Sequence, residues 1–567
     1  MLLNWDREWR EKLLAMIKKI GLNKKFQTSF LLLIITILAG ALRFYNLNWD
    51  LGNYFHPDER NIANAVSQIH FFSQLNPHFF AYGGFSIYLY RLAGDLLTFI
   101  TKNSVWTMNW GNIDIVGRFF SAFFSTLTII PLYFLAQKIS DKKTAFLTII
   151  LYAFTVTSIQ TAHYGVTESL ITLIGVSLCL FSILFLEKAS WLLTLILAVI
   201  LGIGVASKTS AIIFIVIPIL AYLLAVIGKR HTLRKGFLHL ILFLIISFIV
   251  FTMFSPYTFL DSSKFLESMR YESGVATGSL PVVYTFQFDH TIPYLFQIKN
   301  LFWQIGLDTV FCVLGFIFVL FQALKKREKK LLVFLILPLV YFLYVGSWHT
   351  KFIRYVVPII PFLLISSAIL MMKIKSKFHL LGKLFILGTV AVTMIWALAF
   401  FSIYLKPQTR IVASEWIYQN IPYGTRILNE QWDDGLPIPI GKFNSSQYQI
   451  TSLAMYDTDN ATKMQYLSVN LSNSSYIIFN SRRLYGTIIH LTDKYPITSK
   501  YYRLLFAGKL GYQQVAQFSS YPSLLGLIIN DDTSEETFQV YDHPKVIIFK
   551  NIANLSAQQL TQILNKQ

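Results

Sequence analysis

Long apolar runs with almost no charged residues occupy the first 405 residues of this chain. A run of about 18 or more such residues is typical of a membrane-spanning helix and not of the core of a soluble protein. The composition agrees, because only 14% of the residues are charged, against about 25% in soluble domains. The sequence therefore predicts a polytopic α-helical membrane protein with about 11 spans: Phe30–Leu47, Ile115–Leu135, Ala145–Ala162, Leu170–Leu186, Trp191–Ala206, Ala211–Ile227, Phe237–Pro256, Leu301–Leu324, Leu331–Gly346, Tyr355–Met372 and Leu384–Leu405.

The net charge of +20 comes from short basic clusters between these runs. In a soluble protein such a charge favours nucleic-acid binding, but short basic loops between spans mark the cytoplasmic face of a membrane protein, so no nucleic-acid partner is expected. If the N-terminus, residues 1–26, is cytoplasmic and the spans cross the plasma (cytoplasmic) membrane in turn, every cluster lies on the cytoplasmic side. The clusters are Lys18, Lys19, Lys24 and Lys25, then Lys142 and Lys143, Lys229 to Lys235, Lys325 to Lys330, and Lys373 to Lys377.

One further apolar segment, Gly84 to Ile100, carries Arg91 and Asp95 in its middle. Charges at that depth of a bilayer are costly. Counting the segment as a span would also put the cluster Lys138 to Lys143 outside. We therefore expect an amphipathic helix lying on the outer surface, within an outer loop of residues 48–114.

The sequence changes character after Leu405, where residues 406–567 become polar. Short β-rich runs such as Ser475–Asn480 and Lys545–Lys550 alternate with helical patterns such as Ile497–Leu510. This alternation predicts a compact α/β domain. An odd number of spans places it outside the cell, after a membrane domain of residues 27–405.

Ionisable residues on the expected outer face fall in four loops at the ends of different spans. All four loops lie at one membrane level, so we expect their side chains to converge on one interfacial site. The loops are Tyr54–Arg60, His163–Glu168, Ser207–Thr209 and Trp348–Arg354.

Each piece also has a plainer structural interpretation. Pro57, Asp58 and Glu59 suit the first turn of a helix, where carboxylates are favoured by the dipole, and Glu168 has the same interpretation. For Lys208 the plainer interpretation is a snorkelling side chain, but the residue opposes the positive-inside bias, which favours a functional role. His349, Lys351 and Arg354 are typical of interface anchors, so the functional interpretation depends on the shared level.

A chemical task fits such a set. A sugar carried on a lipid phosphate leaves that phosphate at the membrane surface, where cations must bind it. A carboxylate must also take a proton from the attacking hydroxyl group. Arginine binds phosphate with two hydrogen bonds and lysine acts as a point charge.

The chain resembles the GT-C superfamily, and more closely the glycosyltransferase family 39 branch with protein O-mannosyltransferases and the aminoarabinose transferases of lipid A. The resemblance covers roughly the first 405 residues. It consists of PDE (Pro57 to Glu59), GRFFSAF from Gly117, AHYGVTES ending at Ser169, GIGVASKTSA around Lys208, and RYVVPIIPFL from Arg354.

This resemblance implies a hexosyl- or pentosyltransferase that moves a sugar, with inversion, from undecaprenyl or dolichyl phosphate to an extracytoplasmic protein, lipid or glycan. Asp58 matches the family's first-loop acidic residue, a base or metal ligand, with Glu59 as its partner. Glu168 stands where the second-loop acidic residue, often Asp, is found. The resemblance thereby assigns Asp58, Glu59 and Glu168 to catalysis and Lys208 and Arg354 to the donor phosphate. From the same outer loops we expect Lys351 to bind the donor phosphate as well, His56, His163 and His349 to contact substrate, and Asp58 with Glu168 to suit a divalent cation such as Mg²⁺ or Mn²⁺.

Two alternatives stay open. The segment Ser414 to Gly435 resembles the oligosaccharyltransferase region that leads into the WWDYG signature, with Gln431 in place of the first Trp and Asp434 in place of the Tyr. An oligosaccharyltransferase-like enzyme is therefore the second hypothesis. A multi-span transporter is the third, and it is less favoured because the acidic residues lie at span ends and no repeated half is visible.

Overall fold

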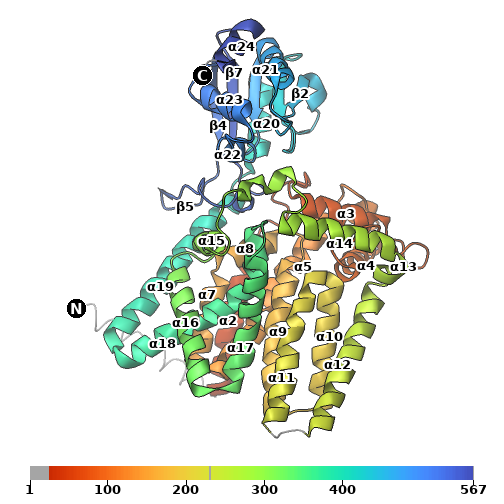
Figure 1. Cartoon of the computed structure of the whole chain (residues 1–567), viewed down its shortest axis with the longest axis vertical. Coiled ribbons are helices and arrows are strands. Elements are labelled where there is room, and N and C mark those ends of the chain that lie inside the picture. The colour runs from red at the N-terminus through yellow and green to blue at the C-terminus, as the bar shows by residue number, and fades with distance from the viewer. Residues whose placement is uncertain (1–23, 229–231, 566–567) are drawn as a thin grey trace.

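A bundle of long helices carries a smaller domain above one end (Figure 1). The computed structural model describes residues 24–228 and 232–565. We call the end of the bundle next to the smaller domain the upper end, as drawn in Figure 1. Lys18, Lys19 and residues 229–231 of the predicted basic clusters lie outside the described residues.

The bundle is formed by apolar helices from the first two thirds of the chain. Its elements are α2 (Lys24–Phe44), α5 (Ile113–Leu127), α6 (Ile129–Ile139), α7 (Lys142–Ala153), α8 (Val156–Gln160), η2 (Thr161–His163), α9 (Glu168–Glu187), α10 (Trp191–Ser207), η3 (Thr209–Ile215), α11 (Val216–Ile227), α12 (Leu233–Phe254), α16 (Asp308–Lys326), α17 (Lys329–Gly346), η5 (Ile353–Ile359), α18 (Ile360–Lys377), α19 (His379–Phe401) and η6 (Ser402–Leu405).

The predicted multi-span fold is confirmed. Among the described residues, nine helices are long and apolar enough to cross a membrane. A tenth span is the pair Lys142–Ala153 and Val156–His163, which is bent by 58°. The remaining predicted span corresponds to α10, which is apolar but shorter.

One predicted span has a different start. The apolar pattern predicts a single helix from Leu301, but the structure has α15 (Leu295–Ile305) and then α16 from Asp308. Gly306 between them has a φ of +82°, a backbone conformation that glycine adopts without a steric penalty. The chain therefore changes direction before it enters the bundle.

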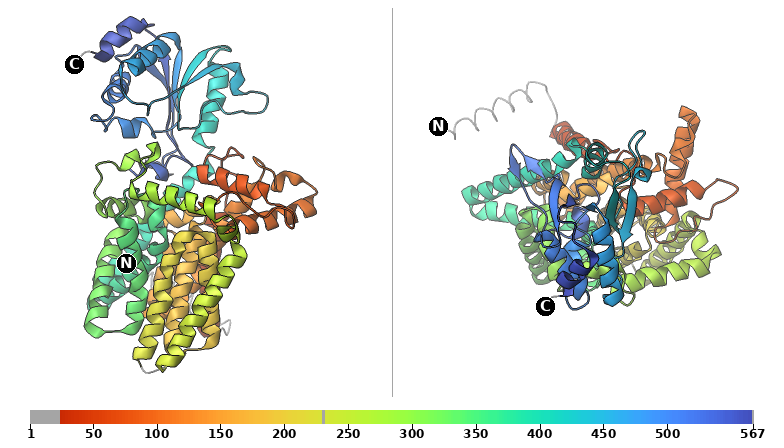
Figure 2. Two further views of the ribbon diagram at one scale, coloured as in Figure 1. Left: turned by 45° about the vertical axis from the view of Figure 1, so that its right-hand side comes forward. Right: turned by 90° about the horizontal axis from the view of Figure 1, so that it is seen from above.

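A layer of helices lies across the upper end of the bundle (Figure 2). It contains α3 (Pro57–Gln68), α4 (Gly84–Thr101), η1 (Ser104–Trp106), α13 (Tyr257–Leu260), α14 (Ser262–Thr277), η4 (Val283–Phe288) and α15. The helix predicted at Gly84 to Ile100 is α4, in which Arg91 binds Asp95 at 3.0 Å. It is not among the helices that meet the criteria for crossing a membrane.

The predicted α/β domain is confirmed in the tail. A five-stranded sheet has the order β2-β1-β3-β7-β4, in which β1 pairs parallel with β2 and β3, and β7 pairs antiparallel with β3 and β4. Its elements are α20 (Thr409–Asn420), β1 (Arg426–Glu430), η7 (Ser445–Gln447), β2 (Gln449–Leu453), α21 (Ala461–Asn473), β3 (Tyr476–Phe479), α22 (Tyr485–Ile488), α23 (Pro496–Phe506), β4 (Tyr512–Phe518), β5 (Ser523–Leu524), β6 (Leu527–Ile528), η8 (Glu536–Phe538), β7 (Val546–Asn551) and α24 (Ala557–Asn565).

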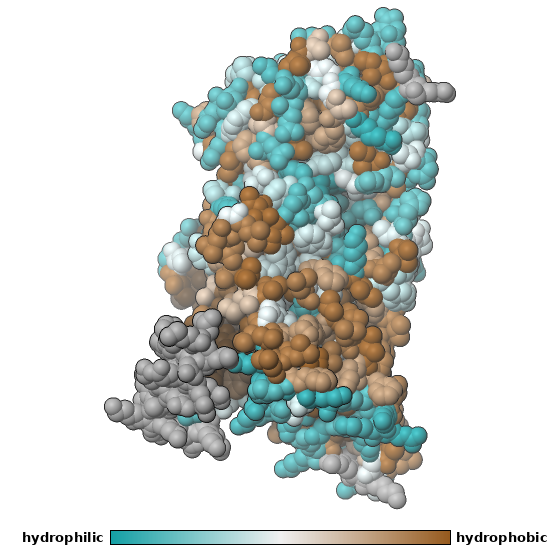
Figure 3. Space-filling model, turned by 90° about the vertical axis from the view of Figure 1, so that its left-hand side faces the viewer, coloured by the Kyte–Doolittle hydropathy of each residue, from teal (hydrophilic) through white to brown (hydrophobic). Residues whose placement is uncertain are grey.

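On the face shown in Figure 3, an apolar belt crosses the bundle, with hydrophilic residues below it. The basic loops gather at this lower end. Lys138, in the last turn of α6, and Lys330, in α17, both bind Glu187 at the end of α9, at 2.5 and 2.7 Å. The predicted basic loops therefore lie at the end opposite the α/β domain.

A buried charged group joins the α/β domain to the bundle. His543 lies between Asp542 and Asp531, at 2.5 and 2.6 Å from its two ring nitrogens. Asp542 also accepts hydrogen bonds from Tyr404 and from Gln160 of α8. Burial opposes the charge, but the two carboxylates raise the pKa of His543 to about 10, so the imidazolium is a fixed link between the two parts.

We expect His543→Asn to lower the free energy of unfolding by about 3–5 kcal/mol, because it leaves Asp531 and Asp542 buried without their cation. The pKa of His543 in the folded protein lies above the ordinary histidine value of 6.5. The stabilisation is therefore fully present below about pH 6.5 and is lost as the pH rises through about 10.

Thermal unfolding in detergent, measured from pH 6 to 10, checks both statements. The exposed His490 provides the control variant, His490→Asn, which we expect to follow the wild type. A His543→Asn variant with the wild-type unfolding midpoint at pH 7 would contradict this role.

Candidate active site

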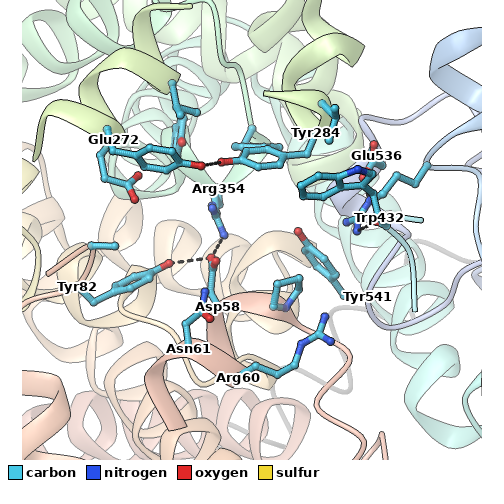
Figure 4. A pocket seen from close by; sticks show the side chains of 18 of the residues that line it. Asp58, Arg60, Asn61, Tyr82, Glu272, Tyr284, Arg354, Trp432, Glu536 and Tyr541 are labelled. Carbon is cyan, nitrogen blue, oxygen red and sulfur yellow. Dashed lines mark hydrogen bonds and ion pairs between the residues drawn. The ribbon is translucent and has the colours of Figure 1, made fainter. Parts of the chain in front are cut away.

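A cavity of about 730 Å³ lies between the upper end of the bundle and the α/β domain. Its walls come from α3, the loop before α4, the C-cap residue of α10, α14, η4, η5 and the α/β domain. Figure 4 shows the side chains that face it, with Asp58 and Arg354 near the centre.

Asp58 reaches the cavity because helix α3 begins beside it. His56 is the N-cap, and its Nδ1 accepts a hydrogen bond from the Asp58 backbone N–H at 3.2 Å. Pro57 occupies the first turn, where its missing N–H costs nothing. The Asp58 carboxylate then accepts hydrogen bonds from the Tyr82 hydroxyl, at 2.8 Å, and from the Arg354 guanidinium.

These contacts keep Asp58 ionised. Burial alone would raise its pKa, but the Arg354 charge, together with His56 and Tyr82, lowers the pKa of Asp58 to about 2. The group is therefore a carboxylate at physiological pH and holds Arg354 over the cavity.

A second ion pair, between Lys208 and Glu168, lies near the pair of Arg354 with Asp58. Lys208, the C-cap of α10, lines the cavity, and its Nζ donates to Glu168 Oε1 at 2.8 Å. Glu168 is buried at the start of α9, and in the described part of the chain its Oε2 has no hydrogen-bond partner. The same holds for Nε of Arg354.

Asp58, Lys208 and Arg354 thus line one cavity, with Glu168 reached through Lys208. They come from segments that are far apart in the sequence, and the sequence analysis expected them at this level. Lys208 is about one fifth exposed, at 22%, as is Arg354. Two cations and one carboxylate are therefore open to a ligand in this cavity.

Glu59 faces the other way from Asp58. It binds Arg118 of α5 through both oxygens, at 2.8 and 2.7 Å, and it accepts the Gly165 N–H at 2.5 Å. Burial raises the pKa of Glu59 to about 7, because the charges of Asp50 and Asp114 raise it further and the Arg118 charge only partly lowers it. Its position is that of a residue that orients α3.

Lys351 does not line the cavity either. Its Nζ donates to the His349 carbonyl at 2.7 Å, and the side chain is buried near the Phe288 ring. His349 lies 3.4 Å from Asp289. Both residues therefore sit away from the group formed by Asp58 and Arg354.

The other two histidines are packed inside the protein. The His56 ring packs at a tilt against Tyr541 and Tyr164, and burial lowers the pKa of His56 to about 4, so it is neutral. His163 is stacked on Tyr404 at 3.7 Å between ring centroids, and both of its ring nitrogens face backbone carbonyls. Neither lines the cavity.

The sequence analysis missed much of the opposite wall. Glu272 of α14, Arg483, Glu536 and Tyr541 all line the cavity, and no local pattern marked them. Burial raises the pKa of Glu272, and the nearby Asp58 charge raises it further. The sequence did contain one signal for this wall, the segment QWDDG, which resembles an oligosaccharyltransferase region.

The QWDDG segment places three residues at the cavity: Trp432, Asp433 and Asp434. Arg60 of α3 binds Asp434 at 2.9 Å, and Arg410 of α20 binds Asp433 at 2.9 Å. The helix that carries Asp58 is therefore tied directly to the α/β domain.

Asp58 and Glu168 do not form a metal site in this arrangement. Each carboxylate is already paired with a cationic side chain, Arg354 for Asp58 and Lys208 for Glu168. Across residues 24–228 and 232–565, no group of three or more His, Cys, Asp or Glu side chains is placed to hold a metal ion.

Comparison with known proteins adds a family match over part of the chain. Residues 104–257 match the family "Dolichyl-phosphate-mannose-protein mannosyltransferase". This region includes α5, α9 and Lys208. A comparison with the curated proteins gives no match.

Solved structures resemble the chain over most of its length. The archaeal oligosaccharyltransferase AglB from Archaeoglobus fulgidus, in complex with an inhibitory peptide and a dolichol-phosphate, has a TM-score of 0.55 at 16% identity, covering 84% of this chain and 72% of that one. The same enzyme in complex with Zn and sulfate has a TM-score of 0.52 at 15% identity, covering 88% and 72%.

A further match is ArnT from Cupriavidus metallidurans bound to undecaprenyl phosphate, with a TM-score of 0.44 at 13% identity, covering 92% of this chain and 98% of that one. The resemblance to AglB extends over both the membrane helices and the α/β domain. The chain has the fold of AglB, and its described residues form nine helices that are long and apolar enough to cross a membrane.

Proposed function

We propose that the chain is a membrane glycosyltransferase that moves a sugar from a polyprenyl phosphate, undecaprenyl or dolichyl, to an acceptor in the cavity beneath the α/β domain. The observation that carries the proposal is the meeting of Asp58, Lys208 and Arg354 in one cavity at the end of the bundle. A carboxylate beside two cations suits a reaction in which a hydroxyl group loses a proton and a phosphate leaves.

The cations take the donor phosphate. Lys208 and Arg354 lie at the ends of membrane helices, where a phosphate attached to a lipid chain rests. Negative charge grows on this phosphate as its bond to the sugar breaks, so both cations stabilise the transition state more than the bound donor.

Asp58 acts as the base. The acceptor oxygen attacks the anomeric carbon, its proton passes to Asp58, and the lipid phosphate departs from the opposite face, so the configuration inverts. The donor phosphate competes with Asp58 for Arg354. Donor binding therefore weakens the ion pair that lowers the pKa of Asp58, and raises the basicity of the carboxylate.

The orientation follows from charge. The basic loops lie at the lower end of the bundle and the α/β domain at the upper end. The excess of Lys and Arg in short loops marks the cytoplasmic side. We infer that the N-terminus is cytoplasmic and that the cavity and the α/β domain face the outside of the plasma membrane.

Oligosaccharyl transfer to a peptide is the second candidate, and one observation favours it. Trp432, Asp433 and Asp434 of the QWDDG segment line the cavity with Asp58. Transport is not favoured, because the cavity walls come from the upper layer of helices and loops, the upper ends of bundle helices and the α/β domain. Purified protein incubated with labelled polyprenyl-phosphate sugars and with polyprenyl-diphosphate oligosaccharides plus peptide distinguishes the two transferases; turnover of neither donor class would contradict both.

We expect Asp58→Asn to lower single-turnover rates by roughly 10²–10⁴ with donor affinity largely kept, because the variant cannot take the proton. Glu59→Gln is the matched control. It keeps the shape of a side chain that does not face the cavity, and Arg118 retains Asp50 and Asp114.

We expect the control to stay within about tenfold of the wild type. Equal losses in the two variants would return Glu59 to the reaction. Full turnover by Asp58→Asn would remove Asp58 from the role of base.

Removing a donor-binding cation should weaken donor affinity by about 10- to 100-fold, since a charge-assisted hydrogen bond contributes about 1.5–3 kcal/mol. The variants are Lys208→Gln and Arg354→Gln, with Arg354→Lys to separate charge from the bidentate contact. Donor binding in nanodiscs provides the measurement.

Lys351→Gln is the control, because Lys351 carries the same charge in the same loop but does not line the cavity. A loss of affinity in this variant, with wild-type affinity in Lys208→Gln and Arg354→Gln, would move the phosphate site to Lys351.

The predicted Mg²⁺ or Mn²⁺ stays a prediction, and the structure motivates the opposite outcome. Lys208 and Arg354 supply the positive charge that a divalent cation would bring to Glu168 and Asp58. We expect turnover in excess EDTA to equal that in Mg²⁺. Loss of turnover in EDTA that Mg²⁺ or Mn²⁺ restores would show that these carboxylates bind a metal.

A further inference from the structure

A small hairpin leaves the α/β domain and returns to the membrane surface. Strands β5 and β6 pair through Ser523 with Ile528 and Leu524 with Leu527. Its base is fixed to the end of the bundle, because Ser523 N donates to Ser402 Oγ at 3.1 Å and Lys406 Nζ donates to Ser523 Oγ at 2.9 Å. Figure 1 shows β5 close to the upper end of α19.

The tip of this hairpin is apolar and exposed. Leu525 is 99% exposed, Leu527 is 58% exposed and Ile528 is 65% exposed. Figure 3 views this side and shows apolar residues gathered above the apolar belt of the bundle. In water, a tip of this composition leaves most of its apolar surface unburied.

The turn itself is unusual for a hairpin in water. Leu525 and Gly526 both have positive φ, +50° and +86°. A two-residue turn of this kind normally takes Asn, Asp or Gly, because a branched side chain is strained there. Leu525 therefore accepts backbone strain at a position where its side chain is almost fully exposed.

An apolar cavity of about 270 Å³ opens at the base of the hairpin. Ile529, next to β6, forms one wall, and Trp303 of α15 with Ile395 and Trp396 of α19 form others. Trp396 donates its N–H to the Trp303 carbonyl at 3.1 Å, so the ring presents only its apolar surface. The cavity walls include no charged residue.

We propose that the β5–β6 hairpin is a membrane anchor, whose tip binds the hydrocarbon chains of bilayer lipids beside α19. The apolar surface of the tip continues into the cavity and into the exposed apolar face of α19, which includes Ile395 and Leu398. Lys406 lies at the base of the hairpin, where its ammonium group meets lipid phosphates.

The membrane anchor explains how the hairpin helps to position the α/β domain. It adds a direct contact between the α/β domain and the lipid, besides the covalent connection after η6 and the charged contacts of His543 and Asp434. The domain that carries Trp432 and Tyr541 is thereby held over the cavity with Asp58. The proposal does not depend on the reaction that takes place there.

A nitroxide label at Leu525→Cys, in protein reconstituted into phospholipid nanodiscs, tests the anchor. The native Cys179 and Cys312 are buried and stay unlabelled. We expect the label to collide with oxygen more than with a water-soluble nickel chelate. Tyr423→Cys, a site 80% exposed on the α/β domain, is the control and should show the reverse.

A label at Leu527→Cys repeats the measurement if Leu525→Cys does not fold. Nickel accessibility at the tip equal to that at Tyr423→Cys would overturn the proposal. The measurement is repeated with added undecaprenyl phosphate, and we expect no change. A tip that leaves water only when this lipid is present would show that the carrier, and not the bilayer, is the occupant.

Discussion

Arg118 of α5 is the charge on which the geometry of the cavity depends. Its fully buried guanidinium binds Asp50 at 2.8 Å and Glu59 at 2.7 Å, and Asp114 lies 3.3 Å away. Losing one partner of a buried ion pair costs about 3–5 kcal/mol, because the remaining charge is left unpaired. This cluster fixes the rotation of α3 about its axis, and that rotation points Asp58 into the cavity.

The α/β domain completes the site through charges of the same kind. His543 between Asp531 and Asp542 joins the domain to Tyr404 and Gln160, and Arg60 of α3 binds Asp434 across the cavity. Trp432 and Tyr541 then form a wall of the cavity whose floor carries Asp58. The cavity therefore belongs to both parts of the molecule, and a change in the docking of the domain changes the site.

Local patterns in the sequence predicted the membrane helices well, because hydrocarbon surroundings demand long apolar runs whatever the tertiary contacts. They failed at Leu301, where Gly306 interrupts an apolar run without changing its composition. The positions of the basic loops correctly predicted that Asp58, Lys208 and Arg354 lie at one membrane level. They could not distinguish these residues from Lys351 and His349, which lie in the same loop as Arg354 but make their contacts outside the cavity.

The sequence by itself determined a multi-span protein with an α/β tail, since apolar length and charge placement act locally. It also determined the level at which the ionisable residues meet. The tertiary structure alone decided which side chains face the cavity. Asp58 and Glu59 are adjacent in the sequence, yet successive residues on a helix point about 100° apart. Only the packing of α3 against Arg118 decides that Asp58 meets Arg354 and that Glu59 is buried.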